Sequence, residues 1–333
     1  MPSFKRTQEV EHFIGAGGDF QLRVTSGDVE LRATQGETAR VRIEFDIRAD
    51  SDADADAIHE GARFRVHTAD GELHVIEPEG ESLGLGSVAR LLRMGRTRVQ
   101  VNVNAEVPAA ARIGFQGVSA DAVATGFVGQ QQYRTVSGDL VLNAVGGDMR
   151  VRGVSGDVSL RADEPIRLEA NTVSGDLSAF APRFDVLRAV TVSGDVELEG
   201  DLATGAEHRV ETVSGDLTFG AVGGLVLEVR GLSSDVEVAV AHRSEGSRDR
   251  RRYVIGDGAA QLLFSSMSGD ASIGAARRMT ARPAPPPVPP APPATPPPPP
   301  LNDDEQLRVL RALERGEIDV DEAARRLGGN HGA

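Results

Sequence analysis

Apolar and polar residues alternate in short stretches along most of this chain, and a four-residue motif separates the stretches. After each copy of the motif, apolar residues stand at the first and third positions with a different residue between them; examples are Leu140/Leu142, Val158/Leu160 and Val196/Leu198. Period-2 alternation of aliphatic and β-branched residues is typical of short β-strands with one buried face. The pattern therefore predicts an all-β protein built from many short strands.

The motif is Val-Ser-Gly-Asp, and it recurs at a nearly constant interval. Intact copies end at Asp139, Asp157, Asp176, Asp195 and Asp216, and looser copies end at Asp28, Asp121, Asp235 and Asp270. From Asp121 to Asp235 the steps are 18, 18, 19, 19, 21 and 19 residues. A fixed period of this size indicates a repeat architecture, in which each unit buries its apolar face against its neighbours.

Residues 136–162 show what one period contains, because they read as three nonamers, VSGDLVLNA, VGGDMRVRG and VSGDVSLRA. Two nonamers make one period, so each coil is expected to hold two strands and two corners. At a corner, Gly tolerates a positive φ, and the side chains of Ser and Asp can hydrogen-bond to nearby backbone amides. The predicted fold is a parallel β-solenoid with coils of about 18–20 residues, stacked at about 4.8 Å.

Four parts follow one another along the chain. Residues 1–97 are a strand-rich section expected to cover the first coil, and residues 98–280 contain the solenoid repeats. Residues 281–301 are a proline-rich linker, and residues 302–333 are a small helical tail. Within the first two parts, Ser51–Ala62 is expected to be an exposed loop or short helix, and Ser244–Arg252 a solvated loop.

Residues 83–98, LGLGSVARLLRMGRTR, also interrupt the strand pattern. Leu91 and Leu92 stand beside Arg90 and Arg93 in this segment. One interpretation is an inserted loop whose leucines pack onto the solenoid. The alternative is a short basic amphipathic helix that rests on an anionic membrane surface or on a partner, through these four residues.

The linker and tail have different signatures. Between Pro283 and Pro300, 13 of 18 residues are proline, which predicts an extended polyproline II spacer. The tail then shows apolar residues at helical spacing up to Gly316, and a capping-box spacing from Asp319 to Glu322 opens a second helix. Two such short helices are marginal alone, so self-association or a partner is expected to cover Leu307, Leu310, Leu313, Ile318 and Leu327.

Composition limits the kinds of metal site, the cellular location and the partners that the protein can have. There is no Cys, which excludes disulfides and thiolate metal sites, and aromatic residues make up only 4 %, which suits a thin aliphatic core. The N-terminus lacks an apolar signal region, and no apolar run approaches the ~20 residues that span a bilayer. We therefore expect a cytoplasmic protein, with membrane association as an alternative. The net charge of −14 argues against nucleic-acid binding.

The repeated aspartates are the main candidates for chemistry. Stacked in register, they would form a row of like charges held by turn amides, splayed into water, or bridged by cations. Calcium-binding β-rolls use a related nonapeptide, which makes Asp139, Asp157, Asp176, Asp195 and Asp216 weak calcium candidates. Here the second glycine of that motif is missing, so corner capping is favoured. No catalytic residue, cofactor or other metal site is predicted.

The repeated Val-Ser-Gly-Asp strands, with a strand end at Val107-Pro108 and an irregular β N-terminus, resemble a bacterial β-strand-repeat family of unknown function labelled putative adhesins. The resemblance covers about residues 5–275. The segment LRVLRALERGEIDVDEAARRL is similar to the short helical C-terminal (SHOCT-like) module that often accompanies such domains. This resemblance implies a noncatalytic β-solenoid, associated in some relatives with cell-envelope stress.

Three functions remain open at this point. The leading hypothesis is a noncatalytic interaction or scaffold protein that self-associates or binds a partner through its C-terminal helices. The second is a membrane-proximal sensor or regulator of envelope stress that docks through residues 83–98. The third is a polymerising scaffold that resembles the bactofilins, which also combine a β-helix with proline-rich tails.

Overall fold

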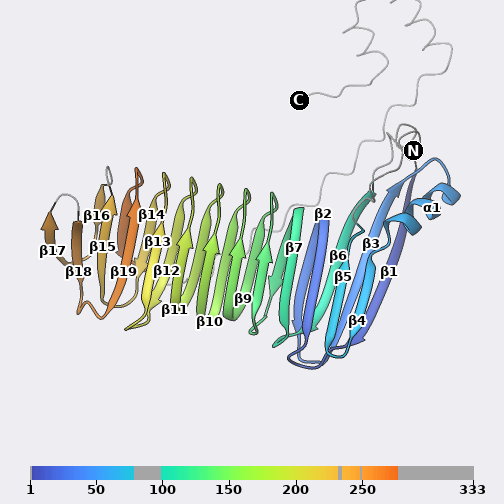
Figure 1. Cartoon of the computed structure of the whole chain (residues 1–333), viewed down its shortest axis with the longest axis horizontal. Helices are drawn as coiled ribbons and strands as arrows, with labels where there is room; N and C mark the ends of the chain where they lie inside the picture. The colour runs from blue at the N-terminus through green and yellow to red at the C-terminus, as the bar shows by residue number, and fades with distance from the viewer. Residues whose placement is uncertain (1, 79–98, 232–234, 248–249, 277–333) are drawn as a thin grey trace, which may run out of the picture. The chain divides into compact units, whose positions relative to one another are not determined.

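The computed structural model describes residues 2–78, 99–231, 235–247 and 250–276, which all belong to the unit Met1–Arg278. Within this unit the strands stand side by side in a long, mostly parallel array (Figure 1). The predicted parallel stacking of β-coils is thus confirmed. The proline-rich linker and the tail that is predicted to be helical, including Leu307, Leu310, Leu313, Ile318 and Leu327, lie outside the described residues.

Each coil contributes one stretch to each of two rows of strands. Row A consists of the stretches that follow a corner aspartate, such as 140–143 and 158–161. Row B consists of the stretches that lead to the next corner, such as 148–152 and 167–171. In the central coils the two stretches join into single long strands, with register shifts where the chain bends between the rows; these strands are β9 (Leu140–Arg152), β10 (Val158–Asn171) and β11 (Leu177–Val190).

Coils at the C-terminal end do not stack in sequence order. The chain passes through β12 (Val196–Leu202), β13 (Glu207–Glu211), β14 (Leu217–Ala221), β15 (Leu225–Gly231) and β16 (Val236–Val238). The last coil, formed by β19 (Ala260–Ser266) and β20 (Ala271–Ala275), then returns and lies between two earlier ones. In row B, β19 pairs with both β13 and β15, and in row A, β20 pairs with both β14 and β16.

A β-hairpin connects β16 to the returning strand β19. Strands β17 (His242–Ser247) and β18 (Arg250–Ile255) pair antiparallel, and β18 also pairs antiparallel with β15. The expectation of a solvated loop over Ser244–Arg252 is therefore wrong, because most of these residues lie in β17 and β18, and β18 pairs with the outer edge of β15. An antiparallel strand on that edge also ends the parallel stacking of row B.

The N-terminal end repeats the same arrangement. Its strands are β1 (Ser3–Phe13), β2 (Asp19–Thr34), β3 (Thr38–Arg48), β4 (Arg65–Ala69), β5 (Glu72–Ile76), β6 (Val99–Pro108), β7 (Arg112–Thr125) and β8 (Gln131–Arg134). The β2 coil lies between β7 on one side and the β5 and β6 coil on the other. Antiparallel pairing of β4 with β5, β3 with β6 and β1 with β3 then completes the end.

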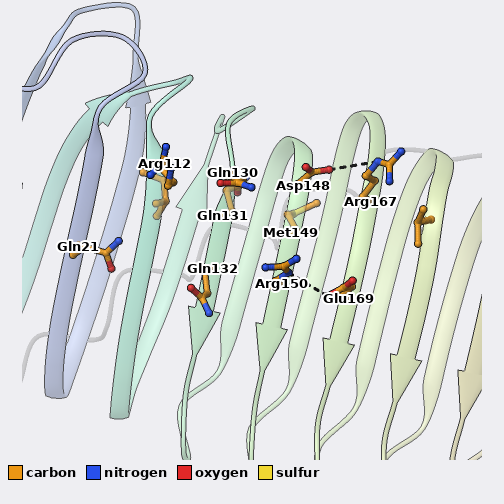
Figure 2. A pocket seen from close by; sticks show the side chains of 12 residues that line it. Gln21, Arg112, Gln130, Gln131, Gln132, Asp148, Met149, Arg150, Arg167 and Glu169 are labelled. Atoms are coloured by element: carbon orange, nitrogen blue, oxygen red, sulfur yellow. Dashed lines mark hydrogen bonds and ion pairs between the residues drawn. The ribbon is translucent and has the colours of Figure 1, made fainter. Parts of the chain in front are cut away.

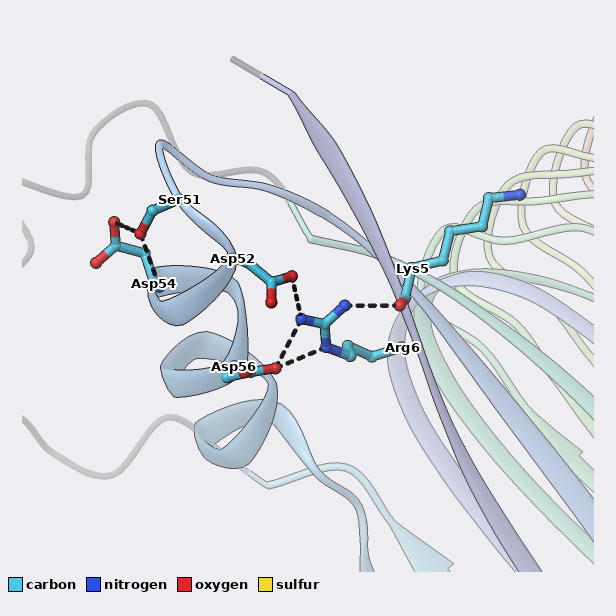
Figure 3. Close-up of polar contacts among 6 residues, drawn as sticks. All are labelled: Lys5, Arg6, Ser51, Asp52, Asp54 and Asp56. Atoms are coloured by element: carbon cyan, nitrogen blue, oxygen red, sulfur yellow. Dashed lines mark hydrogen bonds and ion pairs between the residues drawn. The ribbon is translucent and has the colours of Figure 1, made fainter.

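The single helix of the described residues, α1 (Asp52–Ala62), packs beside β1 and β3. Ser51 caps it, because the Ser51 hydroxyl accepts a hydrogen bond from the Asp54 amide at 3.1 Å. The guanidinium of Arg6 on β1 reaches both Asp52 and Asp56 at 2.7 Å (Figure 3). Of the two expectations for this acidic segment, the short helix is the one observed.

The core lies between the two rows. Leu140 and Leu142 of row A and Met149 and Val151 of row B are all buried, and the same positions are buried in the following coils. Residues between them in sequence point outward. The alternation read from the sequence therefore corresponds to a thin aliphatic core that runs along the stack.

Glycine is required at the corners because successive coils touch there through their backbones. A Cβ on Gly194 would lie 1.9 Å from the carbonyl oxygen of Gly175, and one on Gly215 would lie 1.9 Å from that of Gly194. Neither glycine has a positive φ in the left-handed region. Close approach, rather than backbone freedom, therefore fixes glycine at these two positions.

We expect Gly194→Ala to lower the free energy of unfolding by about 2–3 kcal/mol, because the new methyl group meets a backbone oxygen that cannot move without separating two coils. Urea unfolding followed by circular dichroism would measure the change. The matched control is Gly274→Ala in β20, where a Cβ meets nothing within 4 Å. Equal stability of the two variants would contradict the close-contact account.

Candidate functional site

The corner aspartates form a continuous ladder of hydrogen bonds from coil to coil. The backbone amide of Asp139 donates to the carboxylate of Asp121 at 2.9 Å, and the amide of Asp157 donates to Asp139 at 2.9 Å. The same bond recurs at 2.7–2.9 Å along the rest of the column, in the order Asp157, Asp176, Asp195, Asp216, Asp270 and Asp235. Each of these carboxylates but the last thus holds the next corner in place.

This ladder has two further properties. Asp270 stands between Asp216 and Asp235, so the returning coil fits the column as well as a sequential coil would. In addition, no ion pair joins any of these eight aspartates to a cation within the described part of the chain. The column is therefore a row of exposed carboxylates. They are hydrogen-bonded to backbone amides and form no ion pair with the basic side chains of the described residues.

Buried hydroxyl groups support the same corners from inside. The amide of Gly194 donates to Thr191 Oγ1 at 3.1 Å, and the amide of Gly215 donates to Thr212 Oγ1 at 2.7 Å. Thr135 and Ser266 do the same for their own corner glycines. The sequence reading singled out Ser, Gly and Asp but missed this position, although a Thr or Ser three residues before several of the glycines could have indicated it.

An apolar row runs along the corners beside the aspartates. At seven corners the residue before the serine is Val or Met, and these seven side chains are 41–57 % exposed: Val118, Val136, Val154, Val173, Val192, Val213 and Met267. Amides of successive corner serines donate to the carbonyl groups of this row at 2.7–3.1 Å. We call these seven residues the valine stripe.

A second polar surface covers the outside of row B. From β7 to β13 its outward positions carry more arginines than carboxylates; the arginines are Arg112, Arg134, Arg150, Arg152, Arg167, Arg188 and Arg209, and the carboxylates are Asp148, Glu169, Glu207 and Glu211. We call this surface the arginine face. It contrasts with the net charge of −14 of the whole chain.

At two places on this face, arginines stand in register on adjacent strands. Register places Arg134 beside Arg152 and Arg188 beside Arg209 in adjacent coils. Arg134, Arg152 and Arg188 form no ion pair with any described residue, whereas Arg209 pairs with Glu211. Like charges directly opposite each other destabilise a sheet unless something compensates them.

Shallow hollows lie along the arginine face. One of 220 Å³ is bordered by Arg112, Gln130, Gln132 and Arg150, and ion pairs of Arg150 with Glu169 at 3.1 Å and Arg167 with Asp148 at 3.6 Å cross its rim (Figure 2). Another, of 420 Å³, lies farther along the face and is lined by Glu169, Asn171, Arg188, Val190, Glu207, Arg209 and Glu211. The polar side chains of both hollows include hydrogen-bond donors and acceptors.

The membrane candidates Leu91, Leu92, Arg90 and Arg93 lie outside the described residues, so their contact with a membrane stays a prediction. Among the described residues, no group of three or more His, Asp or Glu side chains is placed to hold a metal ion. No helix in the described part of the chain is long and apolar enough to cross a bilayer.

Comparison with known proteins gives structural matches only. No family model and no curated protein matches the chain. A solved "putative adhesin" from Bacteroides fragilis is 11 % identical over 81 % of this chain and 97 % of that chain, with a TM-score of 0.39. A "putative lipid binding protein" from Parabacteroides distasonis is 9 % identical, over 80 % and 97 %, with a TM-score of 0.38.

A further match is a "putative adhesin" from Parabacteroides merdae, 10 % identical over 81 % of this chain and 96 % of that chain, with a TM-score of 0.30. Solved bacterial proteins labelled adhesins thus match the chain at low identity. The finer resemblance, to one family with a helical C-terminal module, stays a prediction.

We expect Asp176→Ala to destabilise the solenoid by about 1 kcal/mol, because the Asp195 amide loses its acceptor in a solvent-exposed corner. Asp176→Asn should cost much less, since its side-chain oxygen can still accept and a like charge is removed. Thermal unfolding would compare both with Asp163→Ala, an exposed aspartate outside the ladder.

Calcium chloride should leave the melting temperature of the wild-type protein unchanged, because the ladder uses the carboxylates as amide acceptors. A calcium-dependent rise that disappears in Asp176→Asn would contradict this interpretation and support a cation site. Without calcium, an equal decrease in melting temperature for Asp176→Asn and Asp176→Ala would show that the charge of Asp176, and not its hydrogen bond, stabilises the corner.

Proposed function

We propose that the protein is a noncatalytic binding module that holds an extended, anionic and hydroxyl-rich polymer, of the acidic polysaccharide type, along the arginine face. The observation that carries this proposal is the placement of arginines side by side at Arg134/Arg152 and Arg188/Arg209, three of them without an ion pair to any described residue. An anionic ligand would relieve the repulsion that these pairs create.

The mixture of groups on this face favours a glycan over a nucleic acid. Arginines and glutamines can donate to carboxylate and hydroxyl oxygens, while Asp148 and Glu169 can accept from hydroxyl groups. A sugar-phosphate backbone offers few such donors, and the interspersed carboxylates would repel its dense charge. The hollows are shallow and successive, which suits a chain lying across several coils better than a single small molecule.

Removal of two unpaired arginines should weaken binding to polygalacturonate by about tenfold, equivalent to ~1.4 kcal/mol, in Arg152→Gln/Arg188→Gln. Fluorescence anisotropy with labelled polymer at two salt concentrations would measure the loss. Arg40→Gln, on the opposite row, serves as the matched control and should bind like the wild type. No binding by the wild type, or equal binding to neutral dextran, would overturn the proposal.

A second proposal concerns the C-terminal residues, where the sequence pattern is the support. The apolar stripe of the tail, from Leu307 to Leu327, would mediate self-association or partner binding, so that several solenoids act together. A cytoplasmic location and a role in envelope stress belong to this proposal as well. The antiparallel strands at both ends of row B favour this route over a bactofilin-like polymer built by end-to-end stacking.

Light scattering should therefore show an oligomer for the full-length chain and a monomer for a chain ending at Thr280. If both chains have the mass of a monomer, self-association through the tail is wrong. If the shorter chain still forms filaments, the bactofilin-like alternative gains support and the tail is not the contact.

A further inference from the structure

We propose that residues 79–98 dock in cis on the near half of the valine stripe, with their leucines on the valines and their arginines beside the aspartate ladder. The docking site consists only of described residues, chiefly Val118, Val136 and Val154 with Asp121 and Asp139. This inference is independent of the proposed function, which uses the outside of row B, whereas the valine stripe lies on the corners that follow row B.

The first argument is the apolar character of the stripe. Its seven side chains stand about 4.8 Å apart and remain 41–57 % exposed, although the inward apolar positions of the same coils are buried. The core does not need these residues, because the inward positions on either side of each corner already fill it. A continuous apolar row of this kind marks a surface that another segment covers.

The second argument is charge. The aspartate ladder runs beside the stripe, and no described residue forms an ion pair with it. An occupant must therefore combine apolar and basic residues. A second copy of the stripe would bring one row of aspartates against another, which like-charge repulsion disfavours. The segment 83–98 supplies what is needed in its apolar residues Leu85, Val88, Leu91 and Leu92 and in Arg90, Arg93, Arg96 and Arg98.

The third argument is where the segment is attached. Before it, the side chain of Glu77 accepts a hydrogen bond from the Thr25 amide. After it, the carbonyl group of Val101 lies against Gly27, since a Cβ there would be 2.0 Å from that oxygen. Thr25 and Gly27 are corner residues of β2, next to the corner of β7 that begins the stripe. Both ends of the segment therefore emerge on the corner edge.

Chain length limits how far the segment can reach. Leu91 is eight residues before Val99, which allows at most about 26–29 Å of extended chain. Three coils separate this anchor from Val136, or about 14 Å, and seven separate it from Val213, or about 34 Å. Leu91 can therefore cover Val136 but cannot reach Val213. Val213 can therefore serve as a negative control for docking of the segment.

Disulfide trapping tests the contact directly, because the chain contains no cysteine. We expect Leu91→Cys with Val136→Cys to cross-link at least about tenfold faster than Leu91→Cys with Arg134→Cys. Arg134 lies on the same coil and within the same tether length, but on the arginine face. Equal cross-linking rates would mean that the segment is merely tethered nearby and would overturn the proposal.

Proteolysis provides a second readout that does not depend on cysteine. Val136→Glu should increase trypsin cleavage after Arg90, Arg93, Arg96 and Arg98 several-fold, measured by mass spectrometry, whereas Val213→Glu should not. Cleavage that is equally fast in the wild type and in both variants would contradict docking. Wild-type binding to phosphatidylglycerol vesicles that is lost in Leu91→Glu/Leu92→Glu would assign the segment to a membrane and also overturn the proposal.

Discussion

Direct backbone contact between successive corners is the constraint on which the rest of this structure depends. Corner glycines leave no room for a Cβ, and each aspartate carboxylate accepts the amide of the next aspartate in the column. These contacts bring the coils to strand spacing at their tightest point, so that both rows can form parallel ladders between the corners. The aliphatic core then fills the space that the rows enclose.

Equivalence of the corners explains how the ends are built. Because each corner presents the same amide and carboxylate to its neighbour, the coil of β19 and β20 can enter the column between Asp216 and Asp235. The β2 coil occupies a similar inner position at the other end. Both ends of the stack therefore contain a coil that is held on two sides, and antiparallel strands cover row B beyond it.

Much of the fold could be predicted from the sequence because the repeat is local. The corner motif, the buried pairs such as Leu140/Leu142 and the parallel stacking all follow from residues within one period. The order of the last coils could not be predicted, since Ser-Gly-Asp at 268–270 and Ser-Ser-Asp at 233–235 are chemically alike. The residues of 242–255 carry no hairpin signal strong enough to show that they form an edge.

The two surfaces were less predictable than the fold for a related reason. The arginines of row B are scattered in sequence, and only the register brings Arg134 beside Arg152 and Arg188 beside Arg209. The valine of each motif looks like a core residue until the corner geometry turns it outward. The aspartates stand out in the sequence, yet their partners, the amides of the next coil, depend on the stacking distance.

Hydrogen exchange at the corner amides tests the central claim most directly. The amides of Asp157, Asp176 and Asp195 lie in exposed turns, where free amides would exchange quickly, but each donates to a carboxylate of the adjacent coil. The account predicts protection comparable to that of the neighbouring strand amides. Exchange at the rate of an unstructured chain, with the strands still protected, would contradict it.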